Sequence, residues 1–189
     1  MSKRHNKYSW VLLNQSQSPA FQHMMEQLSE RMGPCLMLTG MPHPQISDEV
    51  ELKTGPAYDR RGLGFRAWSW LRFMGSAINQ TSFIGGKPFV LAVTNPPMLP
   101  HWAWLLRKTR GIRYGLLVWD IYPDHIVRQG WAGPKNPLVT SWAALNKRVL
   151  RDAEVIITIG EQMGNALRQQ VDPGTTLPIE VIPNWADTI

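Results

Sequence analysis

Short, continuous apolar runs alternate with longer amphipathic segments along most of the chain. Continuous apolar runs are typical of strands that are covered on both faces, and amphipathic segments are typical of helices that pack one face onto a sheet. We expect strands over residues 8–14, 35–39, 88–94, 115–119, 154–159 and 179–182, and helices over 21–32, 58–81, 97–110, 136–152 and 161–170. The stretch 40–57 predicts mostly loop, with room for one edge strand.

This alternation predicts an α/β fold with a doubly wound, mainly parallel sheet of about six or seven strands. In such a sheet the ligand sits beyond the carboxyl ends of the strands. The loops that follow the strands are therefore the places to look for chemistry. They cover residues 15–19, 95–97, 120–125 and 160–161.

Two of the expected helices have apolar positions at helical spacing, which indicates the faces that they bury. In the helix over 136–152 these positions are Leu138, Trp142, Leu145 and Val149. In the helix that includes residues 61–78 we expect a core face made of Leu63, Ala67, Trp70, Leu71, Met74 and Ile78.

Composition restricts the class of protein. The 189 residues are enough for one domain of ordinary size, and 43% apolar with 18% charged residues excludes a wholly disordered chain. Cys35 is the sole cysteine, so an intrachain disulfide and a cysteine-only zinc site are excluded, which fits a reducing compartment. We find neither a signal peptide nor an apolar stretch of membrane-spanning length, and we expect no metal site.

Charge and tryptophan content suggest the partners. The formal net charge of +6 should attract anions such as nucleic acid, lipid head groups or phosphorylated substrates. Nine tryptophans favour a membrane surface or a sugar, since this ring suits interfaces that are apolar on one side and wet on the other. A second face of the helix over 61–78 combines both features in Arg61, Phe65, Trp68 and Arg72, as membrane-surface helices do. An ordinary solvated basic face is the competing interpretation. Single-stranded nucleic-acid binding is least favoured, because no recognition motif accompanies these residues.

The segment Asp120-Ile-Tyr-Pro-Asp-His125 holds the densest group of chemically active side chains directly after an expected strand. A carboxylate here can accept a proton from a hydroxyl or orient it, and His125 could relay a proton or bind phosphate. The competing interpretation is that Asp120 and Asp124 only cap turns around Pro123.

Two further strand-end loops offer weaker signals. Asn95 and Pro96 could present a side-chain amide on a rigid turn, or could simply end a strand. Gly160 and Glu161 open a helix, where backbone N–H groups can hold an anion, although Glu161 could simply complement the helix dipole. No phosphate-binding glycine motif follows the first strand, which disfavours ATP or NAD binding of the usual kinds.

The second half of the chain resembles the N-terminal domain of glycosyltransferase family 4. The order of its motifs carries the resemblance: Val118-Trp-Asp-Ile-Tyr-Pro-Asp124, Gly130, Asn136-Pro-Leu138, the helix and strand over 145–161, and the segment 179–187. The resemblance implies one half of a GT-B architecture, in which two Rossmann-like domains face each other across a cleft. The N-terminal domain binds mainly the acceptor and the C-terminal domain mainly the nucleotide-sugar. It implies a Rossmann-like acceptor domain over residues 1–182 and the start of an interdomain linker over 183–189, with no donor-binding domain.

The resemblance also assigns candidate roles. Asp120 matches a polar position that faces the cleft, and Tyr122, Pro123 and Asp124 match an Asp-x-x-Pro-acid pattern of the branch acting on bacterial polysaccharides and lipid-linked sugars. On this basis Asp120 and Asp124 are the candidate catalytic residues. The candidate acceptor-binding residues are Asn95, Pro96, Tyr122, His125, Gly160 and Glu161. Many relatives have a glycine-rich first loop, and the glycine-free segment 15–19 departs from it.

These implications give the leading functional expectation. The chain is expected to be the acceptor half of a retaining, metal-independent glycosyltransferase that acts on a cell-envelope or lipid-linked acceptor. It would lie in the cytoplasm, peripherally on the inner face of the cytoplasmic membrane, would need a donor domain or donor subunit, and would use a nucleotide-sugar as substrate with no cofactor. The alternative is a non-catalytic module that binds a lipid phosphate, a glycan or a protein.

Overall fold

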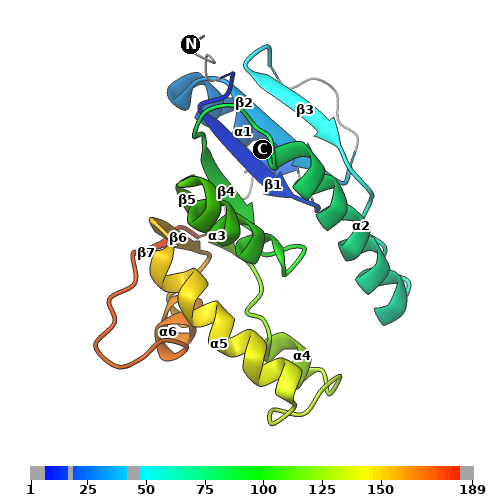
Figure 1. Ribbon diagram of the computed structural model, residues 1–189, viewed down its shortest axis with the longest axis vertical. Coiled ribbons are helices and arrows are strands. Elements are labelled where there is room, and N and C mark those ends of the chain that lie inside the picture. Colours follow the sequence, from blue (N-terminus) through cyan, green and yellow to red (C-terminus); the bar gives the residue numbers. More distant parts are fainter. Residues whose placement is uncertain (1–6, 17–18, 42–46, 184–189) are drawn as a thin grey trace.

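The computed structural model describes residues 7–16, 19–41 and 47–183. The described strands form one seven-stranded sheet in which every neighbouring pair is parallel, in the order β3-β2-β1-β4-β5-β6-β7 (Figure 1). The doubly wound α/β fold is thereby confirmed, and β3 is the edge strand for which the sequence left room. The strands are β1 Trp10–Asn14, β2 Cys35–Thr39, β3 Val50–Thr54, β4 Phe89–Val93, β5 Tyr114–Val118, β6 Val155–Thr158 and β7 Ile179–Val181.

All five expected helices are present, and a short sixth helix, α4, follows β5 within the described residues. The helices are α1 Pro19–Met32, α2 Leu63–Thr81, α3 Leu99–Arg110, α4 Asp124–Arg128, α5 Pro137–Asp152 and α6 Glu161–Gln169. Helix α2 begins five residues later than expected. Asp59 accepts a hydrogen bond from the backbone N–H of Arg61 at 3.0 Å, and such a local turn competes with helical hydrogen bonding.

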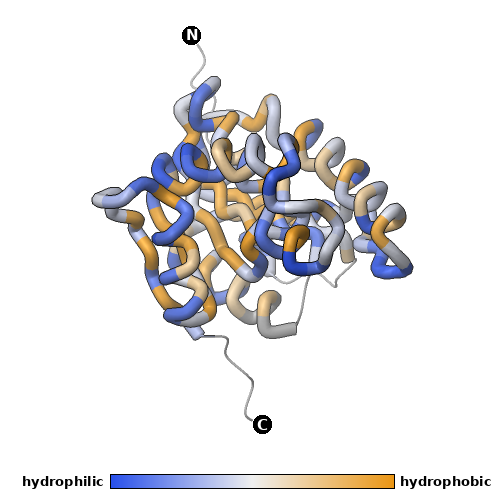
Figure 2. Tube along the Cα trace, turned by 90° about the horizontal axis from the view of Figure 1, so that it is seen from below, coloured by the Kyte–Doolittle hydropathy of each residue, from blue (hydrophilic) through white to orange (hydrophobic). Residues whose placement is uncertain are grey.

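The sheet separates two apolar cores, because successive residues of a strand point to opposite faces. On one face, Phe73 of α2, Leu106 of α3 and Val149 of α5 pack over alternate strand residues such as Leu13 and Leu116. On the other face, α1 contributes Phe21 and Met25. Figure 2 shows the resulting arrangement, with apolar strand segments in the middle and more polar segments around them.

The face that α2 buries differs from the expected one. The buried residues are Ser69, Phe73, Ala77 and Thr81, whereas Leu63, Leu71 and Ile78 are exposed. The expected core face was therefore wrong for these three residues. Apolar residues lie on nearly all sides of α2, so helical periodicity alone could not select the side that packs on the sheet.

A smaller difference concerns α5. Asn136 caps this helix, since its side chain accepts a hydrogen bond from the backbone N–H of Leu138 at 2.9 Å. Val149 is buried as expected, but Leu138 is 80% exposed and does not belong to the core. The buried residues of α5 are Val139, Val149 and Leu150, of which Val149 and Leu150, in its C-terminal half, belong to the core over the sheet.

Candidate functional site

A cavity of about 490 Å³ lies at the carboxyl ends of β5 and β6. Its walls come from residues 119–128, which include α4, and from residues 159–166 at the start of α6. Four residues singled out in the sequence line it: Asp120, Asp124, His125 and Gly160. Arg128, which the sequence did not single out, lines it as well. A cavity thus lies at an edge of the sheet where the strand-end rule predicts a site.

Asp120 is fixed at the start of its loop by the neighbouring strand end. The hydroxyl oxygen of Thr94 accepts hydrogen bonds from the backbone N–H groups of Trp119 and Asp120 at 3.0 and 3.2 Å. The side chain of Asp120 is 47% exposed, and its Oδ1 lies 3.9 Å from Nδ1 of His125. This carboxylate can accept a hydrogen bond from a ligand hydroxyl while the imidazole beside it exchanges a proton.

Helix α4 explains why Asp124 and His125 reach the same cavity as Asp120. The backbone N–H of His125 donates to the carbonyl of Ile121 at 2.9 Å, which folds the chain back after the strand. Asp124 accepts a hydrogen bond from Nε2 of Gln170 at 3.2 Å, so one of its oxygens is held by the protein. The two carboxylates therefore differ, because among the contacts of the described residues only Asp124 is held by a neutral side chain.

Tyr122 lies at the centre of an aromatic cluster beside the cavity. Its ring stacks on Trp142 with centroids 5.8 Å apart and meets Trp70 edge-on at 6.1 Å and His125 at 5.4 Å. Burial, together with the charge of Asp120, raises the pKa of Tyr122, so the phenol stays protonated and can donate a hydrogen bond. The flat faces of such rings suit the C–H-rich face of a sugar.

The cluster extends along α2 and the loop after α4. Tyr58 stacks on Trp70 at 6.3 Å, and Trp131 meets His125 at 6.1 Å. These residues join the site from segments that are far apart in the sequence. An aromatic residue at position 58, 70 or 131 does not by itself predict a ligand contact. The sequence therefore contained no signal for these three residues.

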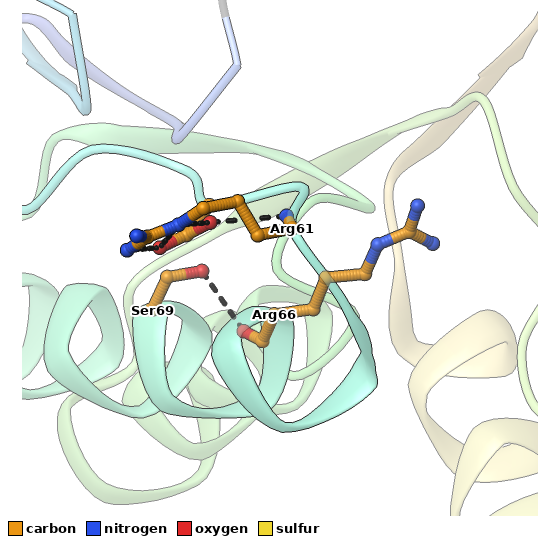
Figure 3. A network of polar contacts seen from close by, with 4 residues as sticks. Arg61, Arg66 and Ser69 are labelled. Carbon is orange, nitrogen blue, oxygen red and sulfur yellow. Dashed lines mark hydrogen bonds and ion pairs between the residues drawn. The ribbon is translucent and has the colours of Figure 1, made fainter.

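Arg66 is a second functional candidate that the sequence did not reveal. Its guanidinium lies over the ring of Trp131 at 6.0 Å, and its charge acts on the Tyr122 phenol. Within the described part of the chain it has no ion-pair partner, and its buried Nε has no hydrogen-bond partner. Figure 3 shows its side chain extending from α2 away from Arg61 and Ser69. This arrangement can receive an anion such as a phosphate.

Asn95 and Pro96 are placed differently. The Asn95 side chain accepts a hydrogen bond from Nε1 of Trp70 at 3.1 Å and donates one to the hydroxyl of Ser16. The backbone N–H of Gln15 also donates to the carbonyl of Asn95 at 3.0 Å. Asn95 thus joins the ends of β1 and β4, and Pro96, which follows a cis peptide bond, is buried.

Glu161 is also outside the cavity. It is exposed in the first turn of α6, and the cavity is lined instead by Gly160 before it and Gln162 after it. In the loop after β1, residues 17–18 lie outside the described residues. Its described residue Gln15 is fully buried and donates from Nε2 to the carbonyls of Pro56 and Ser69, both at 3.1 Å.

Three residues of the expected membrane surface, Phe65, Trp68 and Arg72, lie on the exposed side of α2, and Arg61 is exposed just before this helix begins. Trp68 is 62% exposed, and Phe65 and Arg72 are exposed as well. Arg61 differs from Arg72 because Asp59 accepts hydrogen bonds from its guanidinium, the shortest at 2.7 Å (Figure 3). The exposed Leu71 enlarges this surface beyond the expected residues.

The described residues contain no group of three or more His, Cys, Asp or Glu side chains placed to hold a metal ion. They also contain no helix that combines the length and the apolar character needed to cross a bilayer.

Comparisons with known proteins agree with this fold. Residues 18–185 match the family described as glycosyl transferase 4-like domain. Among solved structures, the chain is similar to sucrose-phosphate synthase from Thermosynechococcus elongatus, with a TM-score of 0.61 and 13% sequence identity. The similarity covers 93% of this chain and 48% of that one, so the chain spans about half the length of this relative. No curated protein matches the sequence.

Proposed function

Because the chain belongs to the glycosyl transferase 4-like domain family, we propose that it is the acceptor-binding half of a glycosyltransferase. The reaction moves a sugar from a nucleotide-sugar to a cell-envelope or lipid-linked acceptor, by a retaining and metal-independent route. The observation that carries this proposal is the cavity at the ends of β5 and β6, into which Asp120, Asp124 and His125 converge.

The proposed roles follow from the contacts. Asp120, which is half-exposed, accepts a hydrogen bond from the acceptor hydroxyl, and His125 at 3.9 Å positions it and exchanges a proton. Asp124, at the start of α4, is the second proposed catalytic carboxylate, and Nε2 of Gln170 holds one of its oxygens at 3.2 Å. The aromatic cluster around Tyr122 supplies ring faces for the acceptor sugar, and the uncompensated Arg66 receives an acceptor phosphate.

The domain organisation is part of the proposal. Residues 1–182 form the acceptor domain, and 183–189 begin a linker, of which 184–189 lie outside the described residues. A donor domain or separate donor subunit binds most of the nucleotide-sugar, and no other cofactor is required. The chain is similar to 48% of the solved relative, which fits one half of a two-domain enzyme.

The test is transfer of radiolabelled sugar from a panel of nucleotide-sugars into a membrane-lipid extract. The chain is assayed alone and after completion with a donor half, either as a longer polypeptide or with its genomic neighbour. In the active form, Asp120→Asn should lower transfer by about 100-fold, the usual scale for losing an acid–base group. Glu161→Gln is the matched control and should stay within about twofold, because Glu161 does not line the cavity.

A non-catalytic binding module is the competing function. It predicts no transfer in either form, while binding of a lipid phosphate or glycan persists. Equal losses for Asp120→Asn and Glu161→Gln would also count against the proposed catalytic role of Asp120, since they would reflect a general disturbance of this end of the sheet.

We also propose that the exposed side of α2 attaches the domain to the inner face of the cytoplasmic membrane. Trp68 and Leu71 can enter the head-group layer while Arg72, which has no ion-pair partner among the described residues, meets lipid phosphate. Arg61 should contribute less, because Asp59 already compensates its charge.

Sedimentation with anionic vesicles tests this attachment. The double variant Trp68→Ser/Arg72→Glu should lose most vesicle binding. The matched control is Arg31→Glu/Met32→Ser, which makes similar changes at the exposed end of α1 and should bind as the parent does. Equal binding by both double variants would remove α2 from the attachment.

A further inference from the structure

A second cavity of about 480 Å³ lies between the start of α3, α4 and the N-terminal half of α5. Its walls are mostly apolar, and its main contributors are Met98, Ile126, Leu138, Val139, Trp142 and Leu145. None of the described residues that line it is Asp, Glu, Lys or Arg. A cavity of this volume is in the range of small-molecule sites.

The polar residues in its wall do not bring charge into it. Burial lowers the pKa of His101, and the nearby polar groups of Asn146 and Pro97 only partly offset this effect, so the imidazole is neutral at pH 7. Trp142 contributes a buried Nε1–H that has no hydrogen-bond partner among the described residues. The cavity therefore suits an uncharged, largely apolar group.

The rim of this cavity is apolar and open to water. Leu138 is 80% exposed and Met98 is also exposed, although both lie beside buried apolar residues. Exposed apolar side chains around an apolar hollow mark a place where a hydrophobic ligand removes surface from water.

This cavity adjoins the candidate site. Ile126 lines it, and the preceding residue, His125, lines the cavity that contains Asp120. Trp142 also lines the apolar cavity, and its ring stacks on Tyr122 of the candidate site. The backbone N–H of Trp131 donates to the carbonyl of Ile126 at 3.1 Å, and the guanidinium of Arg66 lies over the Trp131 ring. Through Ile126 and Trp142 the apolar cavity thus adjoins the group of residues that contains Arg66 and the catalytic candidates.

We propose that this cavity binds the hydrocarbon chain of the acceptor, which is then a lipid whose phosphate or sugar end reaches Arg66 and Asp120. The assignment rests on the proposed acceptor-binding function and specifies its substrate class. It also distinguishes two apolar surfaces, because the exposed side of α2 meets the bilayer as a whole, whereas this cavity holds a single chain.

The test measures binding of dodecyl phosphate, below its micelle concentration, to the 189-residue chain by calorimetry. Inorganic phosphate and decyl maltoside separate the contributions of the anion and the hydrocarbon. Leu138→Gln should weaken dodecyl phosphate binding roughly tenfold, which corresponds to about 1.4 kcal/mol, and should weaken decyl maltoside similarly. Leu105→Gln is the matched control, an exposed leucine of α3 outside the cavity wall, and should change neither.

Leu138→Gln should leave the fold intact, because Leu138 is exposed and its backbone N–H keeps its bond to Asn136. Equal binding of inorganic phosphate and dodecyl phosphate, or equal effects of Leu138→Gln and Leu105→Gln, would overturn the assignment. Met98→Gln provides a second readout on the opposite wall and should weaken the same two probes.

The sugar-transfer assay separates this inference from the proposed function. Transfer that proceeds in the completed enzyme with the same lipid KM in Leu138→Gln would reject the cavity as the chain site and leave the function standing. Dodecyl phosphate binding that depends on Leu138 without any sugar transfer would retain the hydrocarbon site and reject the enzyme.

Discussion

Replacing Phe73 and Leu71 in turn by alanine tests how α2 is rotated on the sheet. Phe73 is fully buried, and its ring packs against the backbone at Gly55, where an added Cβ would lie 3.1 Å from Cδ2. Backbone cannot collapse into the space left by the ring, so Phe73→Ala should lower the free energy of unfolding by about 3–5 kcal/mol.

Leu71→Ala should cost far less. The substitution removes three carbons, each contributing about 0.8 kcal/mol when fully buried, but Leu71 is 65% exposed. The expected loss is therefore about 0.8 kcal/mol. Urea denaturation followed by circular dichroism measures both values. Equal losses, or a larger loss for Leu71→Ala, would refute the packing of Phe73 on the sheet. They would indicate instead that the sheet is covered by the face of α2 that includes Leu71, as the sequence first suggested.

Three further outcomes are expected in the same denaturation assay. Gly115→Ala should destabilise by about 1–3 kcal/mol, because the added Cβ would lie 2.7 Å from Cγ1 of Val155. Gly75→Ala should stabilise slightly, because its Cβ would meet no atom within 4 Å outside its own helix backbone. The reverse order of the two effects would contradict this packing. Arg110→Ala should cost about 2 kcal/mol, because its guanidinium donates to three backbone carbonyls at the end of α2 and just after it. A loss under about 0.5 kcal/mol would show those bonds to be unimportant. Burial lowers the pKa of His101, so the unfolded chain takes up a proton that the folded chain resists, and stability falls as pH drops below about 6.5; His101→Gln should reduce this fall, and an unchanged pH slope would argue against it.

The order of most strands and helices could be predicted because every strand except β3 and the short β7 contains a run of apolar residues, whereas β3 alternates apolar and charged residues and was expected only as a possible edge strand. Helix α4 could not be predicted, since five residues are too few to show a period. The rotation of α2 escaped prediction for another reason. Leu71 and Phe73 are both large and apolar, and only their three-dimensional partners decide which of them packs on the sheet.

The candidate site was predictable as a place but not as a set of residues. Asp120 and His125 follow the end of β5, so the topology of a parallel sheet leads directly to them. Arg66 and Trp131 come from separate segments, and their contact depends on tertiary packing that no local pattern encodes. The roles of the residues in the site remain predictions for the transfer assay.

The bond between Asn95 and Ser16 has a consequence for how this domain can change. It joins the ends of β1 and β4, the two strands between which the chain reverses its direction across the sheet. In many sheets of this topology that boundary is the crevice that receives a ligand. In this domain the Asn95–Ser16 hydrogen bond connects the two sides of that boundary, and the candidate cavity lies farther along the sheet, at the ends of β5 and β6. Substitutions around the cavity can alter the choice of ligand without breaking the Asn95–Ser16 bond. The cavity residues are therefore freer to change during evolution than the residues at the ends of β1 and β4.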